Sequence, residues 1–111
     1  MELQSKQDIS VSLTSLPDKK SAEELAETLV SEGLAACVTV LDGANSIYSW
    51  EGKLEKNSEV LLIIKSQTCL TERLAKRISE LHSYDTPEFL SVSAELASKK
   101  YGQWVKKVTK N

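Results

Sequence analysis

The chain has 111 residues, of which 41% are hydrophobic and 27% are charged, and its formal net charge at pH 7 is −2. This length and composition are typical of one globular domain with an ordinary water-facing surface. The interspersed charges form no basic stripe and no apolar run approaches about 18 residues, so we expect neither a nucleic-acid nor a membrane partner.

The first part of the chain predicts a strand followed by a helix. Residues 1–8 are polar, and we expect a flexible N-terminus there, outside the single domain predicted for residues 9–111. Apolar and polar residues alternate from Ile9 to Thr14, a period of two that predicts a half-buried strand. The next apolar residues recur at helical spacing as far as Gly33, which predicts a helix closed by a glycine in the left-handed conformation.

The residues from 34 to 66 predict a long β-hairpin. Two runs rich in β-branched and aromatic residues, 34–50 and 54–66, flank a turn at Glu51-Gly52-Lys53. Arms of about 14 residues would be about 46 Å long, whereas a domain of about 100 residues is only about 34 Å across. We therefore expect the hairpin to project and to be shared with other subunits. The alternative is a bend at Asp42 and Gly43 that folds it back onto one core.

The remaining elements complete the fold prediction. An apolar stripe at helical spacing predicts a helix that ends near His82, and it consists of Leu70, Leu74, Ile78 and Leu81. Residues 89–96 predict another strand, and residues 101–108 predict a short closing helix. The order β-α-β-β-α-β-α with right-handed crossovers predicts an α+β fold, the ferredoxin-like split βαβ sandwich. It has an antiparallel sheet, the long hairpin and an extra C-terminal helix.

The single histidine, His82, has two interpretations. A protonated imidazole is favoured at a helix C-terminus, so His82 is either a helix cap or, with Glu88, part of a pocket or a metal site. One histidine beside carboxylates is a weak metal signal, because metal sites usually combine several His or Cys ligands. No nucleophile–base pair and no phosphate-binding motif is evident in the sequence, so we expect no enzymatic activity.

Other residues suggest a cleft or a packed interface. Four large aromatic residues carry polar groups: Tyr48, Trp50, Tyr84 and Trp104. They are typical either of core or subunit packing or of the wall of a ligand pocket. Cys37 and Cys69 are far apart and form no ligand pair, which favours reduced thiols and a cytoplasmic protein. Lys65 can meet an anion, although a solvated lysine at a strand end is commoner.

Three motifs stand in the order and spacing of a known family. They are Leu-Ala-Ala-Cys-Val at 34–38, Tyr-x-Trp-x-Gly-Lys at 48–53 and His-x-Tyr-x-x-Pro-Glu at 82–88. In these motifs the chain resembles the CutA family, the small divalent-cation tolerance proteins, over roughly residues 9–108. Ser83 departs from the family's usual proline, which loosens the loop after His82.

The resemblance implies a homotrimer, assembled through the long strands, with an architecture like that of the PII signalling proteins. It implies a role in tolerance of divalent metals, with no required cofactor and with copper or another divalent cation bound at His82 and Glu88. Thr14 stands where some bacterial members carry a metal-binding cysteine, so a thiolate ligand is not expected there. The inter-subunit cleft implied by the motifs contains Cys37, Tyr48, Trp50, Lys65, Tyr84 and Trp104.

Two further functions stay open. The first is a PII-like signalling or scaffold protein whose inter-subunit cleft binds a small anion or a protein partner. Lys65 and the four aromatic residues motivate this alternative. The second is an enzyme with its site at His82, Tyr84 and Glu88, which the missing nucleophile–base pair disfavours.

Overall fold

The computed structural model describes residues 1–110, so the last residue of the predicted domain 9–111 lies outside it. The elements in chain order are β1 (Leu3–Ser5), β2 (Ile9–Leu16), α1 (Lys19–Ser31), β3 (Cys37–Trp50), β4 (Lys53–Gln67), the 3-10 turn η1 (Thr68–Leu70), α2 (Thr71–Leu81), β5 (Leu90–Ser93), β6 (Leu96–Ser98) and α3 (Lys99–Val108). None of the helices in this range combines the length and the apolar character needed to cross a membrane.

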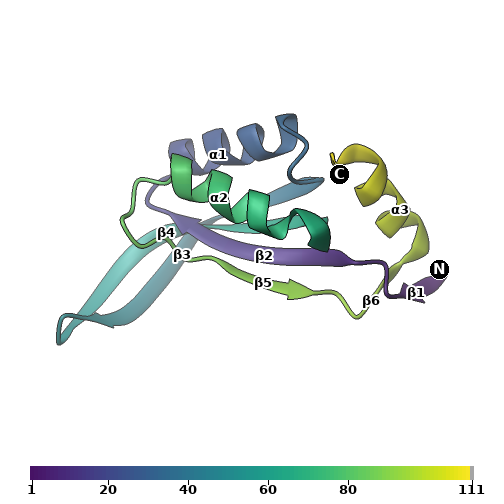
Figure 1. Ribbon diagram of the computed structural model, residues 1–111. Coiled ribbons are helices and arrows are strands. Elements are labelled where there is room, and N and C mark those ends of the chain that lie inside the picture. Colours follow the sequence, from purple (N-terminus) through teal and green to yellow (C-terminus); the bar gives the residue numbers. More distant parts are fainter. Residues whose placement is uncertain (111) are drawn as a thin grey trace.

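A four-stranded antiparallel sheet with the order β3-β4-β2-β5 forms the centre of the fold. The two helices α1 and α2 lie on one side of it, and α3 lies at one end (Figure 1). The units β2-α1-β3 and β4-α2-β5 are the two halves of a split βαβ arrangement. The predicted ferredoxin-like fold with a C-terminal helix is confirmed.

The core lies between the sheet and the two helices. Its buried residues are Leu16, Ala22, Leu25, Leu29, Ala35, Val60, Leu62, Ile64, Leu74 and Ile78. The capping of α1 agrees with the sequence prediction, because the Asp18 side chain accepts a hydrogen bond from the Ser21 amide at 2.8 Å. Gly33 follows the helix with a φ of +73°, a conformation that favours glycine.

The ends of the chain differ from the prediction. The predicted flexible N-terminus contains a paired strand, because β1 forms a two-stranded antiparallel sheet with β6. The strand predicted for residues 89–96 is split into β5 and β6, since only β5 pairs with β2. Gln7 is buried beside β6 and donates from Nε2 to the Ala97 carbonyl at 3.2 Å. These pairings join segments that are about 90 residues apart, so no local pattern indicates them.

The β3–β4 hairpin projects from the domain as predicted (Figure 1). Its two-residue turn, Glu51 and Gly52, has φ values of 51° and 79°, as the tight hairpin turns with positive φ require. A bulge interrupts β3, where Asp42 and Gly43 face the single residue Val60 of β4. The hairpin nevertheless does not fold back, and the chain measures 46 × 24 × 23 Å.

The face of the sheet opposite α1 and α2 is apolar and largely uncovered. Side chains alternate between faces along a strand, so the odd-numbered residues of β2 and β4 share this open face with their register partners. Its apolar members are Val11, Leu13, Leu41, Leu61, Ile63, Leu90 and Val92. Leu90 and Val92 are 62% and 65% exposed, and α3 covers only one end of the sheet, where Val105 packs with Ile9 and Ala36. An apolar surface of this kind is typical of an association site.

Candidate functional site

The candidate site is a pocket between the hairpin and the loop that joins α2 to β5. Its volume is about 810 Å³, within the range of small-ligand sites. It is lined by Ser15, Ser46, Ile47, Tyr48, Trp50, Glu55, Asn57, Glu59, Ser83, Tyr84, Asp85, Thr86 and Glu88. Three of the predicted aromatic residues and the predicted ligand Glu88 therefore meet here. The other predicted metal ligand, His82, is not part of the lining.

A buried carboxylate lies at the base of this pocket. Glu59 is only 9% exposed and is the one charged side chain buried in the described part of the chain. Its Oε2 accepts hydrogen bonds from the Ser15 hydroxyl and from the Tyr84 hydroxyl, both at 3.1 Å. Burial raises the pKa of the Tyr84 phenol, and its hydrogen bond to the Glu59 carboxylate adds to that rise. The network therefore holds the loop of Tyr84 against β2 and β4.

Replacing Tyr84 by phenylalanine is expected to lower the free energy of unfolding by about 1.5–3 kcal/mol, because it removes a hydrogen bond to a charged group. Since the pKa of Tyr84 is higher in the folded state, its contribution is complete below about pH 10 and is lost as pH rises above that. The variant should therefore lose less stability than the wild type between pH 9 and 11. Urea unfolding at these pH values measures both effects. At pH 7 the control is Tyr101→Phe, because no hydrogen bond of that hydroxyl to residues 1–110 is found, and an equal loss of stability in both variants at that pH would contradict the network's role.

His82 is held by hydrogen bonds to the backbone on both sides of its ring. Nε2 lies 2.6 Å from the Ser15 carbonyl oxygen, and the Tyr84 amide donates to Nδ1 at 3.1 Å. Because a carbonyl only accepts, Nε2 carries the proton and donates, while Nδ1 is the acceptor. The His82 amide also closes α2 by donating to the Ile78 carbonyl at 2.8 Å. His82 thus closes α2 through its backbone amide, whereas its ring bonds to the Ser15 carbonyl and the Tyr84 amide and does not cap the last carbonyls of the helix.

A complete metal site is not found within the described chain. No group of three or more His, Cys, Asp or Glu side chains in residues 1–110 is arranged to hold a metal ion. The His82 ring packs at 4.8 Å from the Tyr84 ring, behind the pocket wall, whereas Glu88 is exposed and lines the pocket. A metal ion at His82 would therefore need to replace one of the two hydrogen bonds of the ring.

The other predicted cleft residues lie at the opposite end of the sheet, beside α3. Cys37 is the register partner of Lys65, whose ammonium donates to the Thr39 hydroxyl and the Ile63 carbonyl at 2.5 and 3.4 Å. Burial raises the pKa of Tyr101 and the Cys37 thiol raises it further, which reflects the proximity of α3 to the start of β3. The ring of Trp104 lies 5.6 Å from that of Tyr101. The predicted cleft residues thus form two separate groups in one chain.

Several pocket residues were missed by the sequence analysis. They are Ser15, Glu55, Asn57, Glu59 and Asp85. The only indication of Glu59 in the sequence was its position, as an acidic residue directly before the apolar run 60–64. Its burial could not be foreseen, because it depends on the register that brings β2 alongside β4 and on the loop that carries Tyr84.

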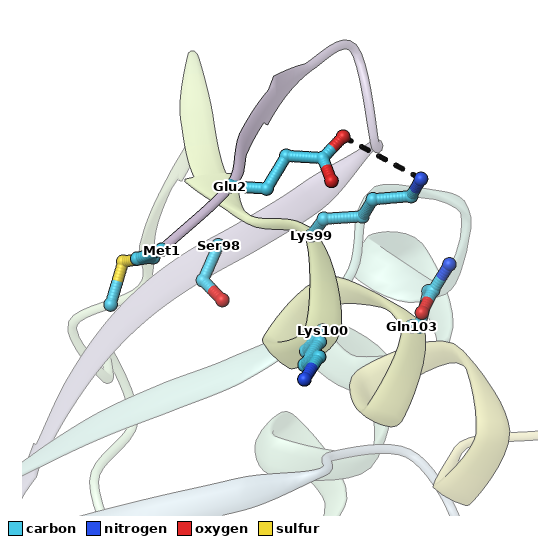
Figure 2. A pocket seen from close by; sticks show the side chains of 6 residues that line it. All are labelled: Met1, Glu2, Ser98, Lys99, Lys100 and Gln103. Atoms are coloured by element: carbon cyan, nitrogen blue, oxygen red, sulfur yellow. Dashed lines mark ion pairs between the residues drawn. The ribbon is translucent and has the colours of Figure 1, made fainter.

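A second hollow of about 640 Å³ lies at the start of α3 and contains none of the predicted site residues (Figure 2). Its lysine Lys99 is paired with Glu2 at 3.6 Å, as the dashed line in Figure 2 marks. Ser98 is occupied as the helix cap and accepts from the Tyr101 amide at 3.3 Å. With Glu2, Lys99 and Ser98 engaged and no aromatic side chain in its lining, this hollow is the weaker candidate.

The comparison with known proteins identifies the family. A family model described as CutA1 divalent ion tolerance protein matches residues 10–108. The chain belongs to this family. It is 44% identical over 98 residues to the divalent-cation tolerance protein CutA of Pectobacterium atrosepticum, covering 88% of this chain and 89% of that protein. It is 41% identical over 96 residues to the chloroplastic protein CutA of Arabidopsis thaliana, covering 86% of this chain.

The CutA fold extends over most of the described chain. The crystal structure of CutA1 from Oryza sativa superimposes with a TM-score of 0.91 at 36% identity, covering 93% of this chain and 94% of that one. The chain spans only 53% of the length of the Arabidopsis protein, so some CutA proteins are considerably longer. The resemblance inferred from the three motifs is therefore confirmed, together with the fold that it implied.

Proposed function

We propose that this protein acts in tolerance of divalent metal ions, binding copper or another divalent cation as a cytoplasmic homotrimer without catalysing a reaction. The main support is the lining of the hairpin pocket, which contains no Lys, Arg or His. Four of the lining side chains are carboxylates: Glu55, Glu59, Asp85 and Glu88. Such a surface attracts cations, and carboxylate oxygens are common ligands of divalent ions. The same lining is unfavourable for a small anion in this pocket.

The uncovered sheet face supports the homotrimer. The single chain leaves an apolar face and a projecting hairpin in water. Association of copies that cover both lowers the free energy, because it removes apolar surface from water. The predicted cleft residues lie at the two ends of the chain, beside the hairpin and beside α3. In a closed ring of copies, the hairpin end of one chain meets the α3 end of the next, and the two groups form one cleft.

His82 and Glu88 are the residues proposed to bind copper. Imidazole nitrogen suits Cu(II), and Nδ1 is the ring atom whose lone pair becomes available when the Tyr84 amide moves away. Glu88 follows on the same loop with an exposed carboxylate. Two ligands do not complete a coordination shell, so further oxygen ligands come from the acidic pocket or from water.

Calorimetric titration with Cu(II) tests this assignment. We expect His82→Ala and Glu88→Gln each to weaken Cu(II) binding by about 10-fold or more, since each removes a ligand. Glu27→Gln, an exposed carboxylate of α1, is the matched control and should bind as the wild type does. Melting of each metal-free variant separates loss of a ligand from loss of the hydrogen bonds of His82. Unchanged affinity in both variants would remove this site from the proposal.

A further inference from the structure

Two charged side chains of β4 lack a partner of opposite charge. Glu59 is nine-tenths buried, and no basic group of the described residues lies within ion-pair distance of it. Lys65 is half-buried, and its ammonium contacts only the neutral oxygens of Thr39 and Ile63. A charge removed from water is costly unless it is paired, so both groups are incompletely satisfied in a single chain.

Glu59 and Lys65 do not pair with each other within one chain. They are six residues apart on an extended strand, which separates them by about 20 Å. Nor does another described group compete for them. The only other lysine that is not exposed, Lys99, is paired with Glu2, and the half-buried Arg77 is paired with Glu32 at 2.8 Å.

Both charges belong to the open face of the sheet. Glu59, Leu61, Ile63 and Lys65 are alternate residues of β4, and Ser15, which donates to Glu59, is on the same face of β2. The apolar residues between the two charges are those that association of copies would cover. Any contact that buries this strip also removes both charges from water, which strongly favours a contact that pairs them.

We propose that Glu59 of one copy forms an ion pair with Lys65 of the partner subunit, so that each hairpin pocket is completed by a cation from the next chain. This inference rests on the homotrimer of the proposed function. In the proposed homotrimer this contact is head-to-tail, and the closed ring satisfies every Glu59 and every Lys65. It also brings Cys37, the register partner of Lys65, to the edge of the neighbouring pocket.

Neutral variants test the pair with little disturbance of packing. Glu59→Gln keeps an acceptor for Ser15 and Tyr84, and Lys65→Met keeps the length of the side chain. Each single variant leaves the opposite charge buried and unpaired, so we expect its melting temperature at fixed chain concentration to fall by roughly 5–10 °C. The double variant buries no unpaired charge and is expected to melt above both single variants. Additive losses in a protein that sedimentation shows to be trimeric would overturn the ion pair and leave the proposed function standing.

Charge reversal shows whether the pair crosses between chains. Glu59→Lys and Lys65→Glu should each reduce the trimer fraction, because all three contacts of the ring then join like charges. The two variants unfolded and refolded together should form more trimer than either alone, because two of the three contacts in a mixed ring pair opposite charges and only one stays repulsive. Native mass spectrometry with one variant isotopically labelled detects the mixed trimers. Glu27→Lys and Lys76→Glu make the same charge changes at exposed positions of α1 and α2, away from the open face, and we expect them to remain trimeric when refolded alone. A mixture with no more trimer than its components would overturn the inference. A monomeric wild type would overturn both the ion pair and the homotrimer.

Discussion

Replacing Val92 by aspartate is expected to convert the proposed trimer into monomers that keep their fold. Val92 is 65% exposed in the single chain and lies opposite Val11 on the open face of the sheet. In the monomer the new carboxylate faces water, and a surface change of this kind usually alters stability by less than about 0.5 kcal/mol. In the trimer the same carboxylate is buried without a partner, which costs several kcal/mol in every subunit.

Sedimentation velocity over a range of concentrations measures this effect, and far-UV circular dichroism verifies that the fold persists. Val30→Asp is the matched control, because Val30 is also partly exposed, at 43%, but belongs to α1 in the helix layer. That variant should remain trimeric. If Val92→Asp also remained trimeric at the concentrations where the wild type does, the interface would have to lie on another surface.

Leu62→Ala is expected to lower the free energy of unfolding by about 2–5 kcal/mol per chain. Leu62 is fully buried in β4, between β2 and β3, and faces the helices. Truncation loses the favourable free energy of burying the leucine side chain away from water. It also leaves a cavity that the surrounding sheet cannot easily fill. The loss is large compared with a typical stability of about 5–15 kcal/mol.

Urea unfolding at one fixed chain concentration measures the loss, since unfolding of an oligomer depends on concentration. The control is Leu81→Ala at the end of α2, where the leucine is 44% exposed, and about 1 kcal/mol or less is expected. Similar losses in the two variants would mean that the packing around Leu62 is much looser than its burial indicates.

The elements that the sequence analysis predicted correctly depend on local signals. The alternation after Ile9 corresponds to β2, and the turn at Gly52 joins β3 to β4. Gly33 follows α1 in the left-handed conformation. Dihedral preferences and the period of apolar residues are properties of sequence neighbours, so they are readable without knowledge of the fold. The three family motifs added the connection to CutA proteins.

The pocket could be predicted only in part, because it depends on contacts between segments that are distant in sequence. Tyr48, Trp50 and Tyr84 were predicted as cleft residues and Glu88 as a metal ligand, and all four line the pocket. The buried Glu59 was not predicted, because its burial requires contacts from two other segments. The separation of Cys37, Lys65 and Trp104 from that group is likewise a consequence of strand register and of the position of α3. Copper binding by His82 and Glu88 stays a prediction.

By itself the sequence determined the fold class, the long hairpin and the family, because these follow from spacing and periodicity along the chain. Only the tertiary structure decided which charges are left unpaired, which sheet face stays open and how the His82 ring is held. The physical reason is that the burial and the hydrogen bonds of a side chain depend on segments that are distant from it in sequence.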